Sequence, residues 1–137
     1  METSIYQSEN IDIIIDMAKI LVIDDDINTT WLIDNVFSKE GYEIHTVNTS
    51  VTALSEALII QPDLILLDLM MPEIDGIGTC KTLQAHPKLK DVPILVFSAS
   101  GDINSKVAAF KAGAKDFITK PVHVEELKSR IRTWINH

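Results

Sequence analysis

A chain of 137 residues with 46% hydrophobic and 23% charged residues has the size and composition of one globular domain, which excludes a disordered protein. The formal net charge of -8, from 20 acidic and 12 basic residues, argues against direct binding of nucleic acid, because such binders present a basic face. Cys80 is the only cysteine, so an internal disulfide is excluded, and the missing secretory and membrane-length apolar segments favour a cytoplasmic protein with no membrane partner.

The first 16 residues differ from the rest of the chain, because they are polar and then alternate isoleucine with aspartate in IDIIID. The string MAKILVIDDD, which follows, reads as a natural start at Met17. We therefore expect residues 1–16 to be an N-terminal extension of unknown role and residues 17–137 to form the domain.

Short aliphatic runs alternate with segments of helical spacing along the rest of the chain. The runs predict five strands, at 19–23, 42–47, 63–67, 93–97 and 115–119. Apolar residues spaced three or four apart predict five helices, at 28–40, 50–60, 76–86, 102–112 and 123–135. Gly41 and Gly113 stand where two of these helices would end. This alternation predicts β-α-β units and a parallel sheet that helices cover on both faces.

A carboxylate, hydroxyl or ammonium side chain directly follows each of four of the five predicted strands. Asp24, Asp25 and Asp26 follow the first strand, Asp68 the third, Ser98 the fourth and Lys120 the fifth. The second strand ends in uncharged residues, so we expect it at an edge of the sheet. Because ligands of open parallel sheets bind at the carboxyl ends of the strands, the other four strands should deliver their polar residues to one crevice.

These residue types suit phosphoryl transfer to an aspartate. Carboxylates within about 4 to 6 Å of one another resist joint ionisation unless a cation joins them, and oxygen ligands favour Mg²⁺. A carboxylate beside the metal could attack phosphorus and form an acyl phosphate, a reaction that needs mainly positioning and charge neutralisation. Lys120 and Ser98 could each hold one phosphate oxygen.

Four ordered motifs carry a resemblance to a known family. They are ILVIDDD, PDLILLDLMMPEIDG, VPILVFSAS and AFKAGAKDFITKPV, within a match from residue 18 to about 135. Together they resemble the receiver domains of two-component response regulators, including the stand-alone chemotaxis type. The resemblance implies an α/β, flavodoxin-like receiver fold, a doubly wound five-stranded parallel sheet of order 2-1-3-4-5 with five helices.

The resemblance also implies a role for each matching residue. Asp68 would accept the phosphoryl group from a histidine kinase or a histidine phosphotransfer protein. Asp25 would bind Mg²⁺ directly and Asp24 through water, while Met70 would offer its backbone carbonyl to the metal. Because Met70 has no amide or carboxylate to orient an attacking water, we predict slow loss of the phosphoryl group. Lys120 would pair with that group.

Further matches concern the switch and two structural positions. Ser98 stands where threonine is most usual and would move toward the phosphoryl group, and Phe117 stands where a tyrosine often acts as the rotamer switch. Pro121 would follow a cis peptide bond, and Gly76 would adopt a demanding backbone conformation in the Asp75-Gly76 turn at the start of the helix predicted at 76–86. A downstream protein would read the change on the face formed by 102–112, 115–119 and 123–135.

Several residues have a simpler interpretation. Asp26 and Asp102 are expected to cap helices, and Cys80 and Trp134 to lie in the core. Trp31 lies off the apolar face of its helix, where it could contact a kinase.

Two other functions compete with a phosphoacceptor switch that assists only its own phosphorylation and dephosphorylation. A phosphatase of the haloacid-dehalogenase type would require Asp-x-Asp after the strand, but the sequence at this position is DLM. A binding module that no longer needs phosphate would typically lack Asp68, the acidic pair or Lys120, and all of these are present.

Overall fold

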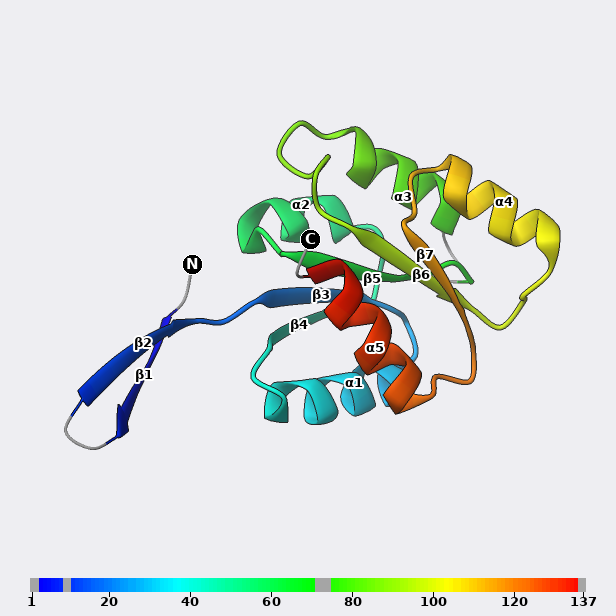
Figure 1. Cartoon of the computed structure of the whole chain (residues 1–137). Coiled ribbons are helices and arrows are strands. Elements are labelled where there is room, and N and C mark those ends of the chain that lie inside the picture. Colours follow the sequence, from blue (N-terminus) through cyan, green and yellow to red (C-terminus); the bar gives the residue numbers. More distant parts are fainter. Residues whose placement is uncertain (1–2, 9–10, 71–74, 136–137) are drawn as a thin grey trace.

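The structure, a computed structural model, describes residues 3–8, 11–70 and 75–135 (Figure 1). Strands β1 (Thr3–Ser8) and β2 (Ile11–Asp16) pair antiparallel, from Thr3 opposite Asp16 to Ser8 opposite Ile11. No strands were predicted in this extension. The alternation of isoleucine and aspartate in IDIIID could have predicted β2, since a period of two is typical of a strand.

A second sheet of five parallel strands forms the centre of the domain. Its strands are β3 (Lys19–Ile23), β4 (Glu43–Val47), β5 (Leu64–Asp68), β6 (Ile94–Ser98) and β7 (Asp116–Thr119). The order β4-β3-β5-β6-β7 confirms the predicted order 2-1-3-4-5 and places the second of these strands at an edge. The chain places β4 on one side of β3 and then crosses back to place β5 on the other side. The order of the strands therefore reverses between β3 and β5, and ligands of open parallel sheets bind at such a point.

Helices cover both faces of this sheet. They are α1 (Ile27–Lys39), α2 (Ala53–Ile60), α3 (Gly76–Ala85), α4 (Ile103–Lys111) and α5 (Val124–Ile135). Helices α1 and α5 lie on one face, and α2, α3 and α4 lie on the other (Figure 1). All five predicted helices are present, and the largest difference in bounds is at α2, which begins at Ala53 rather than at residue 50. No helix among the described residues is long and apolar enough to cross a membrane.

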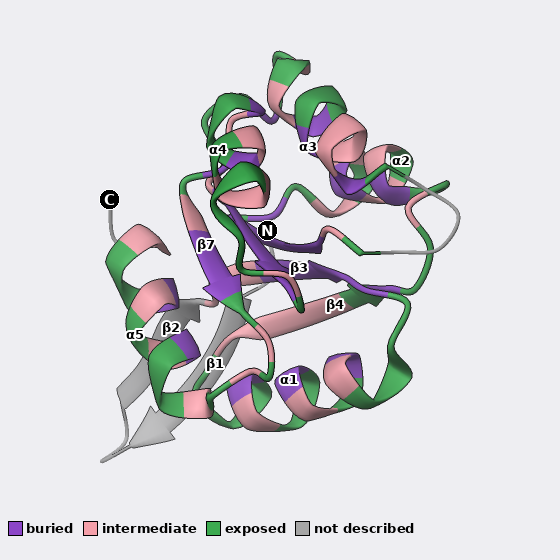
Figure 2. Ribbon diagram, turned by 90° about the vertical axis from the view of Figure 1, so that its right-hand side faces the viewer, coloured by how far each residue is buried: buried purple, intermediate pink, exposed green. Residues whose placement is uncertain are grey.

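The central strands are buried on both faces, as Figure 2 shows for β3. Ile20 and Val22 pack on the side of α1 and α5, whereas Leu21 and Ile23 pack on the side of α2 and α3. Each fully buried aliphatic side chain of this kind stabilises the fold by about 1.5–3 kcal/mol. The sheet is therefore a rigid support for the residues that follow its strands.

The predicted helix ends are confirmed. The carboxylate of Asp26 accepts a hydrogen bond from the amide of Asn28 at 2.9 Å and caps α1, and that of Asp102 accepts from the amide of Ser105 at 3.1 Å and caps α4. Gly41 and Gly113 follow α1 and α4 with φ of +94° and +110°, a conformation that side chains disfavour.

Gly76 requires a correction. It was predicted to adopt a demanding backbone conformation, but it is not among the residues with positive φ. It begins α3 so close to the preceding loop that a Cβ atom there would lie 2.6 Å from the Cα of Leu69. Close approach of two backbone segments, and not an unusual dihedral angle, therefore excludes a side chain at this position.

Candidate functional site at the carboxyl edge of the sheet

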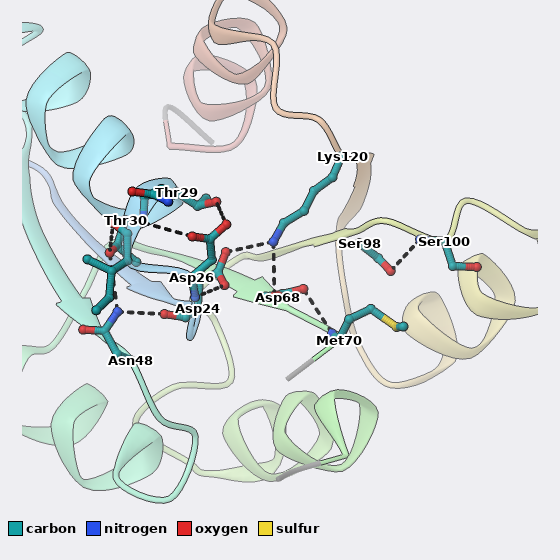
Figure 3. Close-up of polar contacts among 12 residues, drawn as sticks. Asp24, Asp26, Thr29, Thr30, Asn48, Asp68, Met70, Ser98, Ser100 and Lys120 are labelled. Carbon is teal, nitrogen blue, oxygen red and sulfur yellow. Dashed lines mark hydrogen bonds and ion pairs between the residues drawn. The ribbon is translucent and has the colours of Figure 1, made fainter. Parts of the chain in front are cut away.

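The residues at the carboxyl ends of β3, β5, β6 and β7 meet at one edge of the sheet (Figure 3). Asp24, Asp68 and Ser98 are buried there, whereas Asp25 is exposed. Asp24, Asp25 and Asp68 can each present a carboxylate oxygen such that the three atoms lie within 4.8 Å of one another. The crevice predicted from the sequence thus brings three of its acids together.

Asp24 is buried, and both of its carboxylate oxygens accept hydrogen bonds. Its Oδ1 accepts a hydrogen bond from the amide of Asp26 at 2.9 Å, and its Oδ2 accepts from Lys120 Nζ at 3.0 Å. Burial raises the pKa of Asp24 to about 6, although these two hydrogen bonds oppose the shift, and the nearby charge of Asp68 raises it further. A buried carboxylate with a raised pKa is a group that gains from the arrival of a cation.

Lys120, which follows the edge strand β7, bridges two of the acids. Its Nζ lies 3.0 Å from Asp24 and 3.2 Å from Asp68, and 5.0 Å from the centre of the Phe97 ring. Burial disfavours the charged ammonium, but the hydrogen bonds and charges of the two aspartates outweigh it and raise the pKa of Lys120. Phe97 was not predicted as part of the site, since a strand phenylalanine is normally read as core.

The three adjacent aspartates, Asp24, Asp25 and Asp26, have different surroundings. Asp25 belongs to the group of three carboxylates, whereas Asp26 faces α1 and also accepts a hydrogen bond from Thr29 Oγ1 at 2.9 Å. The hydrogen bonds from Thr29 and Asn28 lower the pKa of Asp26. Asp26 is thus occupied as a helix cap, whereas Asp24 and Asp25 both belong to the group of three carboxylates.

Asp68 is held from the opposite side by the loop that follows it. The amide of Met70 donates to Asp68 Oδ1 at 3.0 Å, while the side chain of Met70 is 59% exposed. Because it is a thioether, the side chain of Met70 has no amide or carboxyl group to orient water. The role of the Met70 carbonyl as a metal ligand stays a prediction, and residues 71–74 lie outside the described part of the chain.

The two predicted switch residues lie on neighbouring strands. Ser98 Oγ accepts a hydrogen bond from the amide of Ser100 at 3.1 Å and is turned toward that loop (Figure 3). Phe117 is 8% exposed on β7, and Lys106 Nζ of α4 lies 5.9 Å from its ring centre. The bond between Lys120 and Pro121 is cis, as the resemblance implied.

The donors at the carboxyl ends of the strands fit Mg²⁺. Mg²⁺ prefers hard oxygen ligands, usually one or two carboxylates, and retains several waters. In this site three carboxylates have oxygens within 4.8 Å, one of them exposed and so open to water, and the only cation hydrogen-bonded to them among the described residues is Lys120. The surplus negative charge and the all-oxygen donor set both favour a divalent cation of this kind.

Asn48 contacts the site although sequence reasoning passed over it. It follows the edge strand β4, and its Nδ2 donates to the carbonyl oxygen of Asp24 at 2.9 Å. Because the end of this strand carries no charge, it was not expected to contribute to the crevice. A polar side chain at the carboxyl end of a strand was the only signal for this contact.

Comparison with known proteins shows one consistent match. Residues 20–132 match the model of the response regulator receiver domain. The chain is 38% identical over 116 residues to the DNA-binding dual master transcriptional regulator RpaA of Synechocystis, covering 85% of this chain and 48% of that protein. It is 34% identical over 109 residues to the regulatory protein AtoC of Escherichia coli, covering 80% of this chain and 23% of AtoC. The chain thus spans about half the length of RpaA and less of AtoC.

Solved structures agree with this match. The chemotaxis protein CheY4 of Vibrio cholerae superposes with a TM-score of 0.83 at 27% identity, covering 87% of this chain and 99% of that one. The receiver domain of the Francisella response regulator 1452 superposes with a TM-score of 0.79 at 29% identity, covering 87% and 97%.

Proposed function

Because this chain belongs to the response regulator receiver domain family, we propose that it is a phosphoacceptor switch of a two-component system. Asp68 accepts a phosphoryl group from a histidine kinase or a histidine phosphotransfer protein in a Mg²⁺-dependent reaction. The observation that carries the proposal is the bridge from Lys120 to Asp24 and Asp68, which places a cation beside the proposed acceptor and a proposed metal ligand.

Three carboxylates, those of Asp24, Asp25 and Asp68, would hold Mg²⁺ together with the carbonyl of Met70. When bound, the metal would neutralise charge on the phosphoryl oxygens. The reaction needs further positive charge from the protein, since a phosphoryl group has three equatorial oxygens.

The chain's own residues provide the acceptor and the remaining positive charge. A carboxylate oxygen of Asp68 attacks phosphorus, so that an O–P bond forms while the N–P bond of the phosphohistidine breaks and the imidazole nitrogen keeps the electron pair. Lys120 Nζ already lies 3.2 Å from Asp68 Oδ2 and meets one phosphoryl oxygen after transfer. The hydrogen bond from Met70 to Asp68 Oδ1 holds the carboxylate plane during the attack.

The new charge on Asp68 changes the balance at Ser98. The hydroxyl of Ser98 leaves the amide of Ser100 and donates to a phosphoryl oxygen, and Phe117 moves into the space that opens. The face of α4, β7 and α5 is thereby altered. Ile103 and Phe110 on α4 are 71% and 49% exposed, which supports a role of this face in contacting a downstream protein.

Other partners follow from the surface and the relatives. Trp31, 65% exposed on α1, is a candidate contact for the kinase. The DNA binding in the name of RpaA is a property of that longer protein. For this chain, whose net charge is -8, we propose contacts with proteins and none with DNA. Residues 17–137 form the receiver unit, and residues 1–16 are an extension to it.

A labelling experiment tests the proposal. The protein is incubated with phosphoramidate in Mg²⁺ or in EDTA, and the intact mass and the modified residue are determined by mass spectrometry. We expect one phosphoryl group on Asp68 in Mg²⁺, none in EDTA and none on Asp68→Ala. No labelling in Mg²⁺ would contradict the proposal and favour a phosphate-independent binding module. Repeated turnover of small phosphoesters would instead indicate a phosphatase, which the methionine two residues after Asp68 argues against.

A further inference from the structure

The edge strand β4 contributes to the site through Asn48, the residue that follows Val47 at its carboxyl end. Asp24 continues β3 beside it, and its amide donates to the carbonyl of Val47 at 3.0 Å. The carbonyl of Asp24 accepts from Asn48 Nδ2 at 2.9 Å (Figure 3). A carbonyl can only accept, so the nitrogen end of the Asn48 amide must face it. Two consecutive residues at the end of β4 thus hold both backbone polar groups of Asp24.

The same nitrogen also lies 3.4 Å from Thr30 Oγ1. Thr30 is 4% exposed on α1, and its hydroxyl donates to the carbonyl of Ile27 at 3.1 Å, which leaves its oxygen free to accept from Asn48. Asn48 therefore joins three elements: the end of β4, the segment after β3 and the first turn of α1. The side-chain amide of Asn48 is oriented by Thr30, whose hydroxyl is held by its hydrogen bond within α1.

These contacts bear on Asp25, which no strand or helix contains. The carbonyl of Asp24 and the amide of Asp25 belong to one planar peptide unit, so a bond that holds the carbonyl also sets the direction in which the chain enters Asp25. On the other side of Asp25, Asp26 is fixed as the cap of α1. The exposed carboxylate of Asp25 is thus aimed at the site by its two anchored neighbours.

We infer that Asn48 is a positioning residue of the metal site, which orients Asp24 and Asp25 through the Asp24 carbonyl without touching the metal. This inference rests on the proposed function, since it assigns Asn48 to the same Mg²⁺ site. It gives the strand whose carboxyl end carries no charge a definite task there. Its loss should weaken Mg²⁺ binding and leave the phosphoryl-transfer groups, Asp68 and Lys120, as they are.

The test compares Asn48→Ala and Asn48→Leu with the wild type and with Asn35→Ala. Asn35 is a matched control, because its Nδ2 also donates to a backbone carbonyl, that of Trp31 at 2.8 Å, but within α1 and away from the acids. Asn48 is exposed, so neither substitution leaves a cavity, and leucine preserves the shape of asparagine without a donor. Mg²⁺ binding is measured by calorimetry, labelling by phosphoramidate over a range of Mg²⁺ concentrations, and melting temperature in EDTA.

Both Asn48 variants should raise the Kd for Mg²⁺ about three- to tenfold, the effect of one hydrogen bond, and raise the Mg²⁺ concentration for half-maximal labelling by the same factor. The labelling rate at saturating Mg²⁺ should stay within about twofold of the wild type, because a positioning effect on the metal is overcome by mass action. Asn35→Ala should change neither quantity.

Other outcomes separate the two claims. An unchanged Kd in both Asn48 variants, or a lower melting temperature with an unchanged Mg²⁺ dependence, would overturn the role of Asn48 and leave the proposed function standing. A wild type and an Asn35→Ala variant that neither bind Mg²⁺ nor become labelled would overturn the proposed function itself, and with it the metal site that Asn48 is said to position.

Discussion

The two ends of β7 hold charged side chains in opposite ways. At its amino end, the carboxylate of Asp116 accepts from Arg130 at 2.5 Å, from Trp134 Nε1 at 3.0 Å and from the amide of Phe117 at 2.9 Å. Just beyond its carboxyl end, the single ammonium of Lys120 serves two carboxylates of a group of three. One end has its charge matched within the protein, whereas the other keeps a surplus of negative charge.

This difference separates a structural role from a functional one. The pKa of Arg130 is raised by its hydrogen bond to Asp116, and this hydrogen bond fastens α5 to the sheet. The pKa of Asp24 is raised by burial even with Lys120 beside it, so that this carboxylate is costly to keep charged until a metal cation joins it. An unmatched group of acids at a switch point is therefore a better guide to function than a matched ion pair.

The largest effect is expected within the group of three carboxylates near the carboxyl end of β7. Asp25→Ala should reduce Mg²⁺-dependent labelling by phosphoramidate about 100-fold or more, because it removes a proposed direct ligand, and even the loss of a group that hydrogen-bonds a ligating side chain costs about 10–100-fold. Asp26→Ala should retain most of the labelling, since Asp26 caps α1. Initial rates from intact mass spectrometry compare the two variants. If they lose activity equally, the division of the triplet is wrong.

A second comparison concerns the cations at the two ends of β7. Lys120→Ala should lower the labelling rate at saturating Mg²⁺ about 100-fold, the usual loss on removing one donor that stabilises developing charge. Arg130→Ala should leave that rate nearly unchanged and lower the melting temperature, because Arg130 pairs with Asp116 at the amino end of β7 and with Glu126 on α5. Equal rates in the two variants would contradict the role of Lys120.

The two ends should also respond with opposite sign when a carboxylate is removed. Asp116→Ala should destabilise the protein by about 1–3 kcal/mol, because it leaves Arg130 and Trp134 without this acceptor. Asp25→Ala, at an exposed position, should stabilise the metal-free protein by about 0.2–1 kcal/mol through relief of repulsion. Urea unfolding in EDTA measures both changes, and a shift of the same sign in both variants would refute the contrast.

The smallest effect concerns the lifetime of the product. Met70→Asn should shorten the half-life of the acyl phosphate. The amide of the new asparagine can orient an attacking water, whereas the exposed thioether of Met70 cannot orient one. We expect about tenfold or less, below the usual contribution of a general base, since an amide only positions the water. The half-life is measured after removal of phosphoramidate. A wild-type half-life no longer than that of the variant would show that Met70 does not slow the loss.

Much of the fold and of the site was determined by local sequence patterns. Aliphatic runs and helical spacing predicted the five strands and five helices of the central domain, because burial on one or both faces imposes a period on the residues themselves. The polar residues after the strands predicted that Asp24, Asp68, Ser98 and Lys120 would meet, since parallel strands deliver their carboxyl ends to one edge.

Contacts between distant segments were decided only by the tertiary structure. Lys120 reaches Asp24 across 96 positions of sequence and Asn48 reaches the Asp24 carbonyl across 24, and no local period encodes either distance. Trp134 was predicted as core, yet it is only partly buried and donates to Asp116. A residue's type and spacing indicate which surface it faces, but its hydrogen-bond partner depends on how separate elements pack, which is why the partners of Lys120, Asn48 and Trp134 emerged only in three dimensions.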